Sequence, residues 1–198
     1  MTALVVFAHP LRGSLCGRLA DIATETLAEA GHEVELIDLY AEDFDPRLSA
    51  AERRGYYADD PHGSSAVARH AAALARAEAL VFVFPTWWFG PPAIMKGWID
   101  RVFAPGVAFD HGKDFGPIVP KLRDLRRAAV VTTLGTPWWV DRLAMRRPVR
   151  RMFATAVIGG CAPRARLSYL PLYSAERPQP ERIAAFEQRV RNELSRFR

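Results

Sequence analysis

The chain has 198 residues, of which 49% are hydrophobic and 25% charged, and its formal net charge is +5. This length and composition predict a single globular domain, residues 1–198, with one substantial core. No apolar run is long enough for a membrane span and no signal peptide is visible, so we expect a cytoplasmic protein without membrane insertion. The two cysteines fit no metal-ligand spacing and need no disulfide, so no metal site is predicted.

The first part of the chain predicts a strand, a helix and a second strand. Residues 3–8 form a short apolar run that ends at His9. Apolar residues at helical spacing follow from Leu15 to Ala30, and Gly31 ends this helix. Residues 33–38 alternate in polarity as a half-exposed strand, whereas residues 41–62 are polar and predict the longest irregular stretch.

The rest of the chain continues this alternation. We expect helices from about Ser64 to Arg76 and from Pro148 to Ile158, a helix behind residues 85–92, and a last helix striped by apolar residues from Ile183 to Phe197. The expected strands are residues 80–84, 128–133 and 164–169. Strands that alternate with helices predict a parallel sheet covered on both faces. We therefore expect an α/β three-layer sandwich, with five parallel strands in the flavodoxin-like order 2-1-3-4-5 and a ligand site beyond the carboxyl ends of strands 1, 3 and 4.

The loop after residues 80–84 is the most informative segment. Three adjacent rings, Trp87, Trp88 and Phe89, lie between Pro85 and Pro92. A single aromatic residue in a loop is most often part of the core, but a loop rarely buries three in a row. The segment therefore predicts a platform for a flat ligand.

This segment also resembles the signature of the NAD(P)H:quinone oxidoreductase (DT-diaphorase-like) family of flavoproteins. The family pattern is Pro-x-x-Trp-Phe/Tyr-x-x-Pro-x-x-x-Lys-x-Trp-x-Asp/Glu-Arg-Val. The chain matches it at Pro85, Trp88, Phe89, Pro92, Lys96, Trp98, Asp100, Arg101 and Val102. The resemblance implies that the loop lies along a flavin ring, with cofactor-binding residues Pro85, Thr86, Trp87, Trp88 and Phe89.

Residues 9–16 form a second candidate loop, which contains neither a G-x-G-x-x-G motif nor a P-loop lysine. Ser14 stands where a helix N-cap would, and the free N–H groups at such a helix start can bind a phosphate, although Ser14 could equally be a cap alone. The resemblance implies that this loop binds the flavin phosphate. His9 and Ser14 match the family, whereas Leu15 and Cys16 replace the usual Phe and Asn and are expected to bind through their backbone. Cys16 could be a reactive thiol at a helix start, or only a small helix residue.

The third candidate loop resembles the Thr-Thr-Gly-Gly turn of the family, with Leu134 in place of one glycine. The resemblance implies cofactor contacts at Thr132, Thr133, Leu134, Gly135 and Thr136, where N–H groups would face the flavin edge that gains negative charge. An ordinary strand-to-loop turn is the alternative.

The chain departs from the family after this turn, because Trp138 and Trp139 stand in the stretch where the family has a Tyr and a His. The segment from Phe109 to His111 resembles a substrate-covering loop. We therefore expect Phe109, Trp138 and Trp139 to line the substrate pocket and His111 to be a candidate catalytic acid. A surface role for His111, with water as the proton source, stays open.

The arginines are concentrated in two groups, residues 142–151 and residues 123–127. A solvated basic face is one interpretation, and attraction of an anion such as the extra phosphate of NADPH is the other. Nucleic acid is not predicted, because no groove-reading motif is present and the aromatic residues do not interleave with the arginines.

The leading hypothesis is a flavin-dependent NAD(P)H oxidoreductase that transfers two electrons by a ping-pong mechanism to a quinone-like acceptor. Its cofactor would be FMN, or alternatively FAD, with NADPH or NADH as the hydride donor. The resemblance also implies a homodimer with sites at the interface. The alternatives are a nitro or azo reductase on the same flavin and a flavin-binding regulatory subunit of a membrane transport system. A one-electron flavodoxin is disfavoured, because those carriers are usually acidic.

Overall fold

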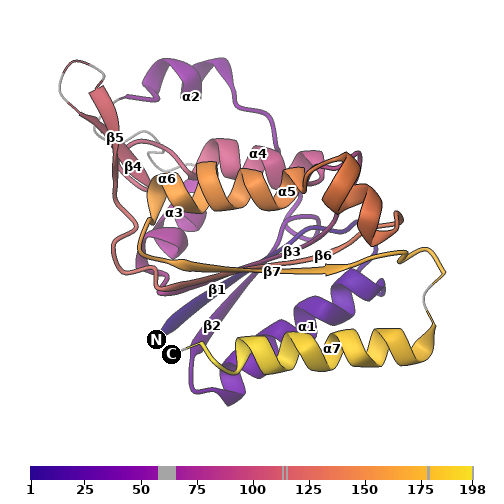
Figure 1. Cartoon of the computed structure of the whole chain (residues 1–198). Helices are drawn as coiled ribbons and strands as arrows, with labels where there is room; N and C mark the ends of the chain where they lie inside the picture. Colours follow the sequence, from indigo (N-terminus) through magenta and orange to yellow (C-terminus); the bar gives the residue numbers. More distant parts are fainter. Residues whose placement is uncertain (58–65, 113, 115, 178, 198) are drawn as a thin grey trace.

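The computed structural model describes residues 1–57, 66–112, 114, 116–177 and 179–197. Its centre is a five-stranded sheet in the order β2-β1-β3-β6-β7, and each neighbouring pair is parallel (Figure 1). The predicted order 2-1-3-4-5 is therefore confirmed. The strands are β1 (Thr2–Phe7), β2 (Glu33–Asp38), β3 (Ala79–Pro85), β6 (Arg127–Thr133) and β7 (Arg166–Leu172).

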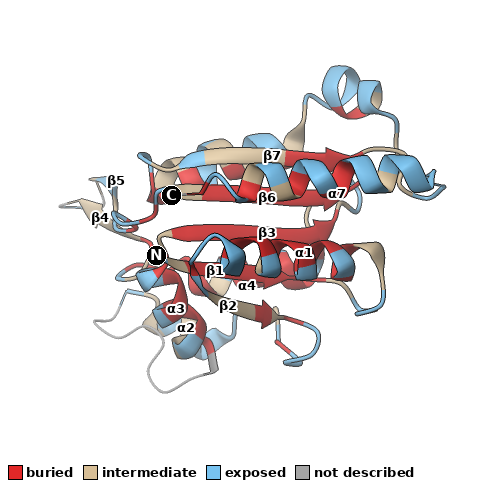
Figure 2. Ribbon diagram, turned by 90° about the horizontal axis from the view of Figure 1, so that it is seen from below, coloured by how far each residue is buried: buried red, intermediate tan, exposed pale blue. Residues whose placement is uncertain are grey.

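The central strands are buried on both faces, as expected for a parallel sheet between two helical layers (Figure 2). Successive side chains of β3 point to opposite faces. Phe82 packs in the core cluster under α3 (Ala66–Arg76) and α4 (Ala93–Val102), whereas Val83 packs in the cluster under α1 (Leu15–Glu29) and α7 (Pro180–Leu194). Within the described residues, no helix is long and apolar enough to cross a membrane.

The helix predicted from Pro148 to Ile158 is a continuous run of three parts, α5 (Pro148–Arg151), η3 (Met152–Val157) and α6 (Ile158–Cys161). Its predicted end at the paired glycines is wrong, because the helix passes through them. Strand β7 likewise extends to Leu172, beyond the predicted end at residue 169. Both elements pack against the buried β6 layer, and this burial outweighs the local stop signals.

Three further elements were not predicted. They are α2 (Ala50–Gly55) inside the stretch expected to be irregular, the antiparallel hairpin of β4 (Phe109–Gly112) and β5 (Gly116–Pro120), and a π-helical turn η2 (Val140–Ala144). Residues 58–62 of that stretch and the expected helix start at Ser64 lie outside the described residues.

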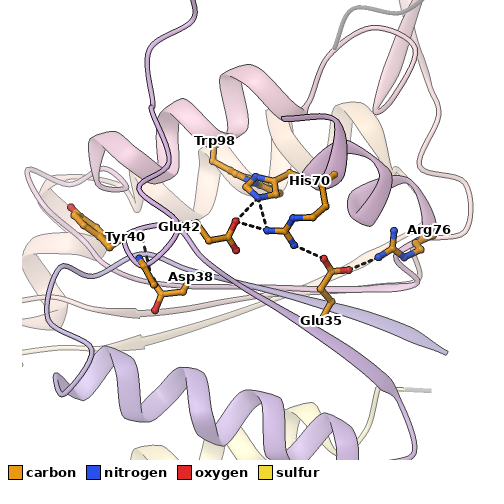
Figure 3. A network of polar contacts seen from close by, with 9 residues as sticks. Glu35, Asp38, Tyr40, Glu42, His70, Arg76 and Trp98 are labelled. Atoms are coloured by element: carbon orange, nitrogen blue, oxygen red, sulfur yellow. Dashed lines mark hydrogen bonds and ion pairs between the residues drawn. The ribbon is translucent and has the colours of Figure 1, made fainter. Parts of the chain in front are cut away.

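A polar network fastens the segment after β2 to α3 and α4 (Figure 3). His70 is 2% exposed and lies at its centre, with Nε2 2.9 Å from an oxygen of Glu42. Trp98 Nε1 donates to His70 Nδ1 at 3.2 Å. Burial lowers the pKa of His70, against the opposing effect of Glu42. A neutral ring that accepts at Nδ1 and donates at Nε2 satisfies both contacts.

Candidate functional site

The candidate site is a cleft of about 690 Å³ at the carboxyl ends of β3 and β6. These ends lie together because Pro85 pairs with Thr133 in the parallel register. The cleft therefore joins two of the three predicted loops, at the edge where open α/β sheets bind ligands. It is lined by Thr86, Trp87, Trp88, Phe89, Leu134, Gly135, Thr136, Pro137 and Glu176.

The aromatic loop is a tight turn that holds its rings outside the core. Trp87 N donates to Gly90 O at 3.0 Å and Gly90 N donates to Trp87 O at 2.9 Å. The two central residues, Trp88 and Phe89, have φ of 50° and 56°, a conformation in which L-residues are uncommon. Trp88 is 100% exposed and Trp87 is 45% exposed. The interpretation of these tryptophans as core residues is therefore wrong, and the turn places them in the wall of the cleft.

The first loop ends in a capped helix that can bind an anion. Ser14 Oγ accepts from Gly17 N at 3.2 Å, which confirms Ser14 as the N-cap of α1. The first turn of this helix carries no acidic residue, and in the described structure no acceptor binds the N–H groups of Leu15 and Cys16. The His9 ring lies 6.4 Å from the Trp87 ring, so this loop adjoins the cleft.

Close packing fixes the first loop on the start of α1. A Cβ atom built on Gly17 would lie 1.9 Å from the carbonyl oxygen of Arg12. The Arg12 guanidinium in turn donates to Gly17 O at 2.9 Å and forms ion pairs with Asp21 and Asp38. Only glycine at position 17 allows the loop to lie this close to the helix.

The third loop is supported from below by the two threonines that end β6. Thr132 Oγ1 lies 2.8 Å from Thr86 Oγ1, and Thr133 Oγ1 lies 3.4 Å from Cys16 Sγ. Both threonines are buried, so their side chains hold the three loops together and do not face the cleft. Leu134 is also buried, and its N–H donates to Leu172 O at 2.8 Å.

The last two residues of this loop carry donors that the protein leaves free. Thr136 lines the cleft, and its buried Oγ1 has no hydrogen-bond partner within the described chain. The N–H groups of Gly135 and Thr136 likewise meet no acceptor among the described residues. Unpaired polar atoms in a cleft wall favour a bound polar group. A flavin has both a ring edge rich in acceptors and a phosphate, so the donors at both ends of the site fit it.

The Cys16 thiol does not belong to the reactive part of the site. Its side chain is 3% exposed, and burial raises its pKa to about 11, despite the contact with Thr133. A thiol of this kind stays protonated at neutral pH and is a poor nucleophile. The interpretation as a small residue of the helix start is the one the structure supports.

Comparison with known proteins decides the family. A family model described as Flavodoxin-like fold matches residues 1–193. The chain belongs to this family.

Relatives within it carry names that agree with the resemblance of the signature segment. A ribosyldihydronicotinamide dehydrogenase-like protein, traD, of Penicillium crustosum is 39% identical over 57% of this chain and 46% of its own length. NAD(P)H dehydrogenase [quinone] 1 of Cavia porcellus is 35% identical over 60% of this chain and 50% of its own. The chain thus spans about half the length of these relatives. The structure of an NAD(P)H:quinone oxidoreductase from Methanothermobacter marburgensis is 27% identical, with a TM-score of 0.80 over 98% of this chain and 94% of its own.

Two residues predicted for this family's site, Phe109 and His111, do not reach the cleft of their own chain. Both lie on β4, and Figure 1 shows the β4–β5 hairpin at the end of the sheet where β1 and β3 begin. The His111 ring contacts Tyr57 and Phe109, with ring centroids 5.5 Å and 5.6 Å away. Within one chain, neither residue therefore lines the cleft, and their predicted place in the substrate pocket would need a second copy of the chain.

The tryptophans after the third loop, which were predicted to line the substrate pocket, lie directly after a cleft residue in the chain. Trp138 and Trp139 follow the cleft residue Pro137 and are each 52% exposed. Glu176, by contrast, is a cleft residue that the sequence did not indicate. It lies beside Gly135, where a Cβ would approach its Oε1 to 2.7 Å. If β7 had been predicted from the sequence to end at Leu172, residues 173–176 would have been placed at the carboxyl edge of the sheet, beside the cleft.

Proposed function

We propose that this protein is a flavin-dependent NAD(P)H oxidoreductase that reduces quinones or similar flat acceptors by two electrons. The observation that carries the proposal is the cleft, in which an exposed tryptophan turn faces unpaired donors at the carboxyl edge of the sheet. The names of the relatives support the same class of reaction.

Each end of the site has a distinct task. The free N–H groups of Leu15 and Cys16, at the positive end of a 15-residue helix, would hold the phosphate of the cofactor. The turn of Trp87 and Trp88 would stack against its ring, and Thr136 would donate to the ring edge. A bound flavin supplies a ring that takes a hydride from NAD(P)H and returns it to an acceptor. We propose FMN, because these elements account for one phosphate and one ring; FAD is the alternative and needs further contacts for its adenosine.

A single cleft implies that the hydride donor and the acceptor occupy the same place in turn. The exposed indole rings offer both of them an apolar stacking surface, and neither reaction step needs a nucleophile from the protein. We therefore expect ping-pong kinetics. Nitro or azo compounds, being flat electrophiles, are alternative acceptors at this surface.

The protein is expected to bind one flavin per chain when it is reconstituted with FMN or FAD. Anaerobic addition of NADPH or NADH should bleach the flavin absorbance to the two-electron reduced form, and a quinone should restore it. Parallel initial-rate lines would establish the ping-pong order. Bound flavin that neither nucleotide bleaches would favour a regulatory flavoprotein, and a protein that binds no flavin would contradict the proposal.

We also propose a homodimer, in which Phe109 and His111 of one copy cover the cleft of the other. The hairpin cannot serve its own cleft, and an apolar groove of about 300 Å³ beside it suits coverage by a second copy. The groove is lined by residues that include Ile99, Phe103, Phe109, Ile118 and Met152.

Changing Ile118→Asp should convert the dimer to monomer and lower turnover, because it places a charge in this groove. Val119→Asp is the matched control, since Val119 points to the other face of β5 and is 41% exposed against 51% for Ile118. Sedimentation velocity and turnover should change together in Ile118→Asp only. A monomeric wild type, or a dimer that both variants preserve, would contradict this arrangement.

A further inference from the structure

An arginine-lined pocket of about 380 Å³ lies at the free edge of the sheet. Strand β7 is an edge strand, with α5 on one face and α7 on the other (Figure 1). Guanidinium groups reach the pocket from both helical layers, and two tyrosines of the β7 segment form its floor. The residues concerned are Arg142, Arg147, Arg150, Arg189, Tyr169 and Tyr173.

The positive charge of this pocket is not neutralised by the protein. None of its four arginines forms an ion pair with any described residue, whereas Arg69, Arg76 and Arg101 all do. Asp141 is the carboxylate beside the pocket, and it is 0% exposed. One of its oxygens accepts from Tyr173 Oη at 2.8 Å. Four guanidinium groups against Asp141 and Glu193, which acts electrostatically on Arg189, leave an excess of positive charge that favours a multiply charged anion.

The side chains of two of these arginines and the backbone of a third are also held in place. The Arg142 guanidinium lies over the rings of Trp138 and Tyr173, at 5.7 Å and 6.0 Å from their centroids. Arg189 Nη2 donates to Pro171 O at 3.3 Å. Arg147 has a φ of 52°, and its N–H donates to Asp141 O at 2.7 Å. A preorganised set of donors loses less conformational entropy when it binds a phosphate than free surface arginines do.

The pocket floor provides one more donor. Tyr169 Oη is buried without a hydrogen-bond partner among the described residues. Burial and then the neighbouring Asp141 raise the pKa of Tyr169, so its hydroxyl keeps its proton. A buried hydroxyl beside guanidinium groups can donate to an anionic oxygen.

We propose that this pocket binds a phosphate monoester, and that its ligand is the ribose phosphate that distinguishes NADPH from NADH. The assignment to NADPH rests on the proposed function. Trp138 links the cleft to the pocket, because it follows the cleft residue Pro137 in the chain and the Arg142 guanidinium lies over its ring. A dinucleotide with its nicotinamide in the cleft can thus extend past Trp138 to the arginines.

The kinetic test compares the two nucleotides in matched variants. In Arg150→Gln and Arg189→Gln, kcat/KM for NADPH should fall about tenfold, the effect of losing one charge-assisted hydrogen bond, while that for NADH stays within about twofold. Arg164→Gln removes the same charge just before β7, outside the pocket, and should change neither value. Equal losses for both nucleotides, or no loss, would overturn the proposal.

A binding test needs neither flavin nor turnover. Isothermal titration of the purified protein should show tighter binding of adenosine 2′,5′-bisphosphate than of adenosine 5′-monophosphate. This difference should disappear in Arg150→Gln and persist in Arg164→Gln.

Equal binding of both probes would mean that the arginines only protect a sheet edge and would overturn the proposal. Displacement of the bisphosphate by an equal concentration of inorganic phosphate would assign the pocket to free phosphate and overturn the link to NADPH. If the protein binds no flavin, the proposed function fails, yet this titration still reports on the pocket.

Discussion

Replacing Trp98 by alanine is expected to lower the free energy of unfolding by about 3–5 kcal/mol, the range for truncating a large buried aromatic side chain. Trp98 is 0% exposed, and its ring meets Phe82 and Phe103 with centroids 6.1 Å and 5.9 Å away. The change would open a cavity in the core between the sheet and α4. It would also leave His70 Nδ1 buried without its donor, which adds about 1–3 kcal/mol to the loss if no water replaces it.

Urea unfolding followed by circular dichroism measures this effect, and Trp88→Ala is the control. Trp88 belongs to the same signature and is 100% exposed, so its truncation should change stability by less than about 0.5 kcal/mol. Trp88→Ala should instead weaken flavin binding. A loss below about 1 kcal/mol in Trp98→Ala, or similar losses in the two variants, would contradict this division of the signature.

The signature thus has two halves with different physical roles. Its first half forms the strained left-handed turn of Trp88 and Phe89, in which Trp88 is fully exposed. Its second half lies on α4 and anchors a distant segment: Arg101 donates to Glu52 Oε1 at 2.6 Å and lies over the Phe44 ring at 5.1 Å. The signature segment therefore contains residues that stabilise the fold as well as residues of the candidate site.

The sequence predicted most accurately those elements that have a clear sequence period. Strand β2 has the predicted bounds, and its apolar residues Val34 and Leu36, which alternate with Glu33 and Glu35, pack against one core cluster. The start of α1 was also predictable, since Ser14 is a good N-cap and its hydroxyl makes the expected bond. In both cases the local preference and the tertiary contacts point to the same structure.

The missed elements lack such a period. Helix α2 buries no residue, so its only signal was the capping box of Ser49 and Glu52. Among the described residues, β4 and β5 form a two-stranded sheet of their own, and most of β5 is exposed. The η2 turn has no amphipathic pattern to detect, because among its residues Asp141 alone is buried.

The position of His111 within one chain could have been predicted from the topology. In a β-α-β crossover the segment between the helix and the next strand returns to the amino end of the sheet. Residues 103–126 lie between α4 and β6, so His111 had to lie far from the cleft of its own chain. The proposed homodimer, with its sites at the interface, is the arrangement that would bring His111 to the cleft of a second copy.

Gly17→Ala is expected to weaken flavin binding by at least about tenfold, because it would force the loop proposed to bind the phosphate off its helix. The new Cβ would lie 1.9 Å from Arg12 O and 3.0 Å from Arg12 C, both of them backbone atoms. The loop cannot relieve this contact by turning a side chain. It has to shift, and Ser14 with the free N–H groups beside it would shift too.

Gly13→Ala separates this effect from a general loss of loop freedom. A Cβ on Gly13 meets nothing within 4 Å, although Gly13 lies in the same loop. Flavin titration followed by fluorescence should therefore give an unchanged dissociation constant for Gly13→Ala and a raised one for Gly17→Ala. Unfolding curves should show a loss of about 1–3 kcal/mol in the second variant, which leaves enough folded protein for the titration. Wild-type affinity in Gly17→Ala would mean that the phosphate is bound elsewhere, since the proposed donors of Leu15 and Cys16 depend on the close approach of this loop to α1.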